Sequence, residues 1–144
     1  LLPGNENFVL EIKNACAMPR LLLDTNIILE YLHGEGGVVP LFDAFGEGTI
    51  KIDISVITEF ELLAYPKLTA HEEASIGLLL KEMNIQPVDH RVATTAALLS
   101  RQYRGTPNDL FIASTALLYN IPLVTHNVRD FKKIKNLNIL TEWP

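Results

Sequence analysis

Short apolar runs alternate with longer segments of helical periodicity along most of this chain, and this alternation constrains the fold more than any other feature. The runs 20–24, 50–54, 122–125 and 138–140 have the length and composition of strands. Strands that alternate with helices form βαβ units, in which helices cover both faces of a mostly parallel sheet. The sequence therefore predicts a three-layer α/β/α sandwich around a mostly parallel sheet of four to five strands.

Capping motifs place the starts of several helices. Thr58-Glu59-Phe60-Glu61 and Thr69-Ala70-His71-Glu72 both fit the Thr-x-x-Glu capping box, so we expect helices to begin at Thr58 and Thr69. Asp89 can cap a third helix, and Pro107 suits the first position of a fourth. The expected helical segments are 26–33, 38–46, 58–65, 69–83, 90–104, a segment that opens at 106–109, and a short turn over 129–133.

The length of 144 residues fits one domain. Residues 1–17 look unlike the rest, and Met18 directly precedes the first apolar run. We therefore expect the native domain to span 18–144, which leaves 1–17 as an N-terminal extension that need not be native.

Cysteine usage and hydropathy indicate the compartment. The single Cys16 excludes an intramolecular disulfide framework and any cysteine-based zinc site. No apolar stretch reaches the roughly 18 residues that a membrane-spanning helix needs. We expect a cytoplasmic protein with no membrane association.

Acidic residues stand where several elements meet one edge of the expected sheet. Asp24 ends the first apolar run, Glu59 and Glu61 open the helix after the second, and Asp109 opens a later helix. Each has a structural explanation as a helix cap or a first-turn acid. Together, however, such carboxylates would repel one another unless a cation neutralised them. Hard divalent cations with oxygen ligands, Mg²⁺ or Mn²⁺, fit this composition.

A fourth segment follows the run 122–125 at the same expected edge. Asn127 and Asp130 can offer oxygen ligands there, although Asp130 could instead cap the turn that follows it. The four histidines are scattered without HxxxH spacing, which argues against zinc.

Taken in order, these motifs resemble the PIN domain, and in particular the VapC-type toxins of bacterial and archaeal toxin–antitoxin pairs. The resemblance covers about residues 18–144. The segments that carry it are Leu22-Leu23-Asp24-Thr25-Asn26, then 55–63 (SVITEFELL), 108–113 (NDLFIA) and 122–131 (PLVTHNVRDF).

The resemblance implies a ribonuclease whose acid cluster binds one or two Mg²⁺ or Mn²⁺ ions. Asp24 and Asp109 match the first and third acids of the family, and Glu61 matches the second better than Glu59 does. The fourth acid of the family corresponds either to Asn127, where this chain has an amide in place of the common acid, or to Asp130. Supporting roles would fall to Thr25, Asn26, Glu59, Thr125 and Asn127.

The resemblance also implies partners: an RNA substrate, a cognate antitoxin protein and a second copy of the chain in a homodimer. The segments 26–46 and 58–83 carry apolar faces that could form such interfaces, although most of these residues also suit a core. Two other readings stay open at this point. One is a catalytically weak PIN-like scaffold that binds RNA or protein. The other is a phosphatase or phosphotransfer receiver, which the pattern around Asp24 fits poorly.

The formal net charge of −5 argues against a purely electrostatic nucleic-acid binder. The charge is uneven, however: 12 acidic and four basic residues lie up to Leu80, and five acidic and eight basic residues follow from Lys81. Residues of the second half could therefore contact RNA phosphates. The candidates are Arg101, Arg104, Arg129, Lys132 and Lys133.

Overall fold

The computed structural model describes residues 10–11 and 18–143. The extension expected over 1–17 lies outside these residues except at 10–11, so the domain boundary near Met18 stays a prediction. The elements are β1 (Arg20–Leu23), α2 (Thr25–Leu32), the 3-10 turn η1 (Gly36–Val38), α3 (Val39–Gly46), β2 (Lys51–Ser55), α4 (Val56–Leu63), α5 (Ala70–Lys81), β3 (Asn84–Gln86), α6 (His90–Gln102), α7 (Pro107–Tyr119), β4 (Leu123–Val124), α8 (Val128–Phe131) and β5 (Ile139–Leu140).

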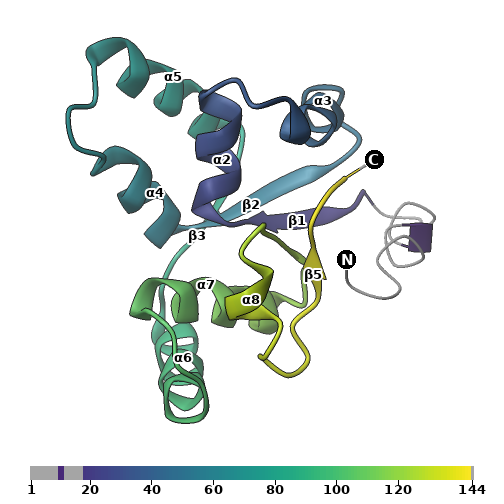
Figure 1. Cartoon of the computed structure of the whole chain (residues 1–144), viewed down its shortest axis with the longest axis vertical. Coiled ribbons are helices and arrows are strands. Elements are labelled where there is room, and N and C mark those ends of the chain that lie inside the picture. Colours follow the sequence, from purple (N-terminus) through teal and green to yellow (C-terminus); the bar gives the residue numbers. More distant parts are fainter. Residues whose placement is uncertain (1–9, 12–17, 144) are drawn as a thin grey trace.

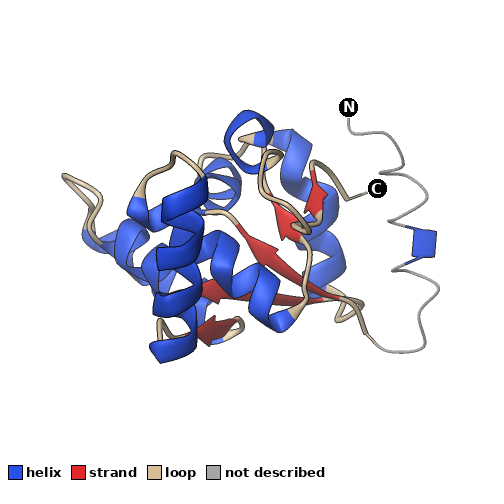
Figure 2. Ribbon diagram, turned by 90° about the horizontal axis from the view of Figure 1, so that it is seen from below, coloured by secondary structure: helices blue, strands red, loops and turns tan. Residues whose placement is uncertain are grey.

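The sheet has five strands in the order β3-β2-β1-β4-β5, and every neighbouring pair is parallel. Helices cover both faces of the sheet (Figures 1 and 2), so the predicted three-layer α/β/α sandwich is confirmed. From the central strand β1 the chain adds β2 and β3 on one side of the sheet, and it later adds β4 and β5 on the other side. The strand order therefore reverses at β1, which makes the carboxyl end of β1 a topological switch point. Ligands of open parallel sheets bind beyond the carboxyl end of the strands at such a point.

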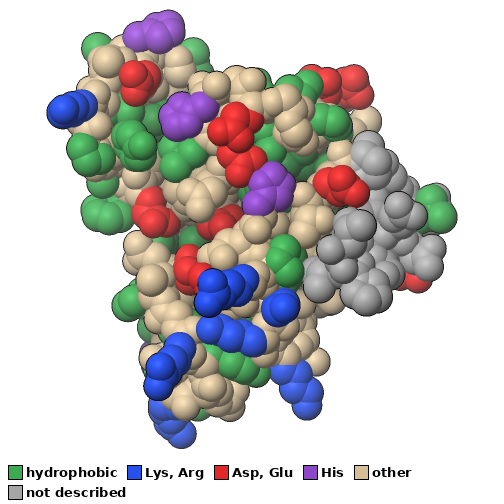
Figure 3. Space-filling model, viewed as in Figure 1, with side chains coloured by type: hydrophobic (Ala, Val, Ile, Leu, Met, Phe, Trp, Pro, Cys, Tyr) green, Lys and Arg blue, Asp and Glu red, His purple; other side chains and the backbone are tan. Residues whose placement is uncertain are grey.

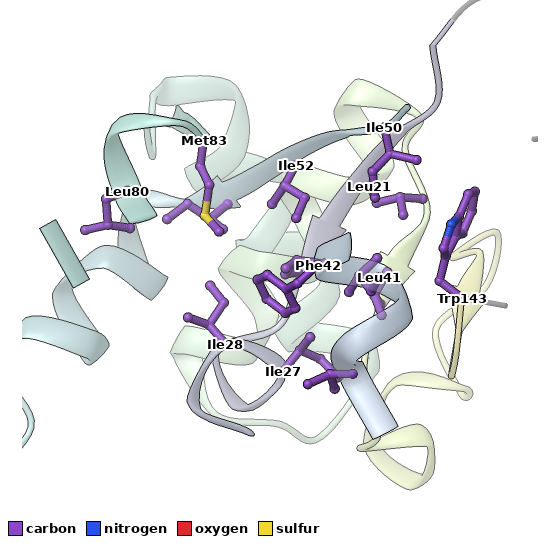
Figure 4. Packing of buried hydrophobic residues seen from close by; sticks show 14 of the residues in the cluster. Leu21, Ile27, Ile28, Leu41, Phe42, Ile50, Ile52, Leu80, Met83 and Trp143 are labelled. Carbon is purple, nitrogen blue, oxygen red and sulfur yellow. The ribbon is translucent and has the colours of Figure 1, made fainter. Parts of the chain in front are cut away.

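Alternate side chains of β1 enter two different cores. Leu21 and Leu23 pack with the helices α2, α3 and α5, together with Trp143 near the C-terminus (Figure 4). Leu22 points to the opposite face and packs against α6, α7 and α8. All three leucines are fully buried, as expected for a central strand that is covered on both faces.

The structure corrects the expected start of α4. The capping residue is Ser55, whose hydroxyl accepts a hydrogen bond from the Ile57 amide at 3.1 Å, so the helix begins at Val56. Thr58 is therefore inside the helix and fully buried. By contrast, the expected capping roles of Thr69 and Asp89 are confirmed, and Thr106 caps α7, because each side chain accepts a hydrogen bond from the first turn of its helix.

The edge strand β3 has no counterpart among the expected strands. Two of its three residues, Asn84 and Gln86, are polar, and both donate side-chain hydrogen bonds to Asp53 of β2, at 3.2 and 2.7 Å. Asp53 is fully buried and also forms an ion pair with Arg20 of β1. The edge strand is thus joined to the sheet by a polar network that no apolar run reveals.

Within the described part of the chain, no helix combines the length and the apolar character that crossing a membrane would require.

Candidate functional site

Asp24 lies immediately beyond the end of β1, at the carboxyl edge of the sheet. One of its carboxylate oxygens accepts a hydrogen bond from the Thr25 amide at 2.8 Å, and it thereby caps α2. The other accepts one from the Thr125 hydroxyl at 2.8 Å, across from the end of β4. The side chain is almost completely buried. Its capping role is therefore real, but it leaves a buried carboxylate held in a fixed orientation.

Glu61 reaches the same edge from α4. Its Oε1 atom lies 2.8 Å from the hydroxyl of Thr25, the residue next to Asp24. Because α4 begins at Val56, Glu61 stands beyond the first turn and does not cap its helix. Glu59 lies in that first turn and takes no part in the hydrogen bonds between Thr25, Thr58 and Glu61. This placement favours Glu61 over Glu59 as the second acid.

Burial and mutual repulsion act on the acids of this edge. Desolvation raises the pKa of Asp24, and the neighbouring charges of Asp109 and Glu61 raise it further, against the lowering effect of the hydrogen bond from Thr125. Desolvation also raises the pKa of Asp109, again with contributions from Glu61 and Asp130. Carboxylates from separate elements therefore lie close enough to raise the pKa of Asp24 and of Asp109 by their charge.

The donor set fits a hard divalent cation. All four groups offer oxygen, and the charges that act on Asp24 (from Asp109 and Glu61) and on Asp109 (from Glu61 and Asp130) are all negative. Within the described residues, no three acidic, histidine or cysteine side chains form a set placed to hold a metal ion together. Mg²⁺ does not require one, because it commonly binds through one or two carboxylates and keeps several waters. The oxygen-only donor set is therefore compatible with a hydrated divalent cation at this edge of the sheet.

Asn127 and Asp130 form the rim of this edge. The Asn127 side chain donates to the Asp130 carboxylate at 3.0 Å, and its backbone amide donates to the Thr125 hydroxyl at 2.9 Å. Asp130 is exposed on α8, unlike the buried Asp24. Asn26 is also exposed, in a hollow that it shares with Asn127. Of these two rim residues only Asp130 carries a charge, and that charge acts on Asp109, so the rim favours Asp130 as the fourth acid.

Basic side chains gather beside the acidic edge. Figure 3 shows them over α8 and the adjoining part of the α6–α7 region, next to the acidic groups. The Lys133 ammonium donates to the backbone carbonyl of Arg104, which brings two distant segments together. All five predicted RNA contacts are exposed on this half of the chain: Arg101, Arg104, Arg129, Lys132 and Lys133.

Thr58 belongs to the hydrogen-bonded group of Thr25, Thr58 and Glu61, whereas the capping-box pattern predicted it as the cap of its helix. Its hydroxyl lies 3.0 Å from that of Thr25. The signal that could have found it is the spacing Ser55-x-x-Thr58-x-x-Glu61, because residues three apart share one face of a helix. With Ser55 as the cap, that face turns Thr58 and Glu61 together towards Thr25.

Comparisons with known proteins agree with this fold. The sequence model described as the PIN domain matches residues 21–137. Ribonuclease VapC1 of Haemophilus influenzae is 30% identical over 124 residues, which cover 81% of this chain and 92% of that protein. Ribonuclease VapC19 of Mycobacterium tuberculosis is 29% identical over 121 residues, or 81% and 95% of the two chains. A chain of a toxin–antitoxin complex from Klebsiella pneumoniae superposes with a TM-score of 0.71 at 27% identity, covering 84% and 96%.

The chain therefore belongs to the PIN-domain family. Within that family it is a VapC-type protein, since its relatives at comparable length carry that name. This assignment confirms the resemblance drawn from the four motifs, and it removes the phosphatase and receiver readings.

Proposed function

We propose that this chain is a Mg²⁺- or Mn²⁺-dependent endoribonuclease that acts as the toxin of a toxin–antitoxin pair. The observation that carries the proposal is the buried carboxylate of Asp24. The charges that act on it, those of Asp109 and Glu61, are both negative. An uncharged side chain could cap α2 equally well, whereas a buried charge without a cation is unfavourable, so the carboxylate itself points to a cation. The names of its VapC relatives support RNA as the substrate.

Each residue would contribute a specific part. Asp24 and Asp109 would hold the cation directly, with Glu61 as a third ligand or as the acceptor of a bound water's hydrogen bond. Asp130 would complete the acidic set at the rim. When bound, the cation supplies Lewis-acid chemistry: it activates water for attack on phosphorus and offsets charge in the transition state. Thr25 and Thr125 keep the carboxylates oriented through the hydrogen bonds they donate.

The basic half of the chain would bind the RNA backbone. Arg129 and Lys132 flank Asp130 at α8, and Lys133 lies against the segment that leads into the helix of Asp109. Phosphate contacts of this kind position a nucleic acid without reading its sequence. RNA binding should therefore weaken steeply with salt and depend on the cation that neutralises the acidic edge.

Cleavage of a labelled mixed-sequence RNA, with and without Mg²⁺, tests the proposal. We expect EDTA to abolish cleavage and Asp24→Asn or Asp109→Asn to lower its rate by about 100-fold or more, since several kcal/mol of charge stabilisation are lost. Asp43→Asn is the matched control, because Asp43 is an exposed acid on α3. Equal cleavage by the wild type and Asp24→Asn would refute the site. Metal-independent RNA binding without cleavage would point to the scaffold reading.

An antitoxin and a second copy of the chain are the protein partners we propose. The solved relatives include a complex that is described as toxin–antitoxin. An apolar groove of about 310 Å³ between α2, α4 and α5 is lined by residues such as Leu32, Leu62 and Tyr65, all from the two segments expected to form interfaces. We expect the product of a small adjacent gene to co-purify with the wild type, but not with Leu32→Glu.

Light scattering on the isolated protein tests the homodimer, and a monomeric mass would contradict it.

A further inference from the structure

Thr58 is a buried helix residue whose hydroxyl does not serve its own helix. Ser55 caps α4, so Thr58 has no capping role. The buried hydroxyls of Ser114 and Thr115 in α7 donate to the carbonyls four residues before them, at 2.7 and 2.8 Å. That bond is the usual one for a hydroxyl inside a helix. Thr58 Oγ1 instead lies 3.0 Å from the hydroxyl of Thr25, on a different helix.

The direction of these hydrogen bonds follows from counting protons. An ionised carboxylate only accepts, so the Thr25 hydroxyl donates its single proton to Oε1 of Glu61. Thr25 then has no proton left for Thr58. The Thr58 hydroxyl must therefore donate to the Thr25 oxygen. The three groups form one directed chain, from Thr58 through Thr25 to Glu61.

We infer that Thr58 is a positioning residue of the candidate site, which orients the Glu61 carboxylate through Thr25. This inference rests on the proposed function, because it concerns the cation that Glu61 would help to bind. Thr58 is fully buried, so no water replaces its proton when the hydroxyl is removed. A hydrogen bond accepted by Thr25 also polarises the bond that Thr25 donates. Without it, the Thr25 hydroxyl keeps only its bond to Glu61, and that bond holds the carboxylate less firmly.

Mn²⁺ affinity of the full chain, measured calorimetrically without RNA, tests the inference independently of activity. Groups that orient metal ligands change affinity by about 10–100-fold when they are lost. Because Thr58 acts through Thr25, we expect Thr58→Val to weaken Mn²⁺ binding by about tenfold, the lower end of that range. Thr58→Ser keeps the hydroxyl and should restore binding to within about twofold of the wild type.

Thr115→Val is the matched control, because Thr115 is an equally buried helix threonine whose hydroxyl bonds only within α7. We expect it to lose stability as Thr58→Val does while keeping the Mn²⁺ affinity of the wild type. Equal Mn²⁺ affinities of Thr58→Val and the wild type would overturn the inference. So would an equal loss in Thr58→Val and Thr115→Val, which would indicate a general structural effect.

The hydroxyl protons of the wild type offer a second measurement that needs neither a variant nor a metal. We expect the Thr58 and Thr25 hydroxyl protons to exchange slowly with water in NMR spectra, with a cross-peak between them. Rapid exchange of the Thr58 proton would refute the chain of hydrogen bonds. If the wild type binds no Mn²⁺ at all, the proposed function fails, and these protons still decide whether Thr58 orients Thr25.

Discussion

Asp24 follows β1 and Asp53 lies in the neighbouring strand β2; both are buried aspartates, and their surroundings differ in one decisive respect. Asp53, in the body of β2, accepts hydrogen bonds from Asn84 and Gln86 and forms an ion pair with Arg20. Asp24, just beyond the end of β1, accepts hydrogen bonds from Thr25 and Thr125, but the charges that act on it are negative.

The difference shows what each carboxylate does for the protein. The charge of Asp53 is balanced inside the fold, and it joins three strands that are far apart in sequence. The carboxylate of Asp24 is held in place by hydrogen bonds, but only negative charges act on it, so a cation from outside would balance it. A buried acid is therefore a candidate for function when the fold supplies hydrogen bonds without a counter-charge. Four measurements can break or sharpen this contrast.

Removing the counter-charge of Asp53 should have the largest effect on stability. Arg20→Leu leaves a fully buried carboxylate without its cation, and breaking such a pair costs about 3–5 kcal/mol. The Arg20 side chain is 39% exposed, so we expect a loss near the lower end, about 3 kcal/mol of the unfolding free energy. Urea denaturation measures it. The double variant Arg20→Leu, Asp53→Leu should recover much of the loss, and a double variant no more stable than the single one would contradict this account.

Adding the missing counter-charge at Asp24 should have the next largest effect. A ligand that binds only the folded state stabilises it by about 1.4 kcal/mol at ten times its dissociation constant. We therefore expect Mn²⁺ to raise the melting temperature of the wild type in a concentration-dependent way. Asp24→Asn should lose this response, and Asp53→Asn should keep it. A shift of equal size in Asp24→Asn would show that the cation binds elsewhere.

Local patterns in the sequence revealed the sheet and the acids, but not the groups that distinguish Asp24 from Asp53. The leucines of β1 predict a central strand, and Asp24 directly after them indicates the carboxyl edge of the sheet. Arg20 and Asp53 are 33 residues apart, and so are Thr25 and Thr58, so no spacing rule connects them. Ser55 and Thr58 both have side chains that can cap a helix, and the structure shows that Ser55 is the cap. The strand β3 was not predicted from the sequence, because its polar side chains form hydrogen bonds to Asp53 and do not produce an apolar run.

Neutralising each aspartate in the metal-free protein should give effects of opposite sign. Asp53→Asn weakens bonds to Arg20 and should destabilise the fold by about 1–3 kcal/mol. Asp24→Asn keeps an oxygen that can cap α2 and removes an unbalanced buried charge. It should stabilise the fold at pH 7, by about 1 kcal/mol as is common when a functional site is neutralised. Denaturation of both variants in EDTA provides the comparison, and destabilisation by Asp24→Asn would contradict our description of its charge.

The pH dependence of that gain is the smallest and most specific effect. The pKa of Asp24 is raised in the folded state above its ordinary value of 3.8, so between these two values the native protein binds more protons than the unfolded chain. The contribution of Asp24 to stability is therefore favourable at low pH and is lost as the pH rises through the raised pKa. It follows that Asp24→Asn should be no more stable than the wild type below pH 3.8. Its full gain in unfolding free energy should be seen at neutral pH. The pKa of Asp109 is shifted in the same direction, so Asp109→Asn should follow the same course. A stability difference between Asp24→Asn and the wild type that stays constant from pH 3 to pH 7 would mean that the mutation acts through packing, and that the carboxylate carries no unbalanced charge.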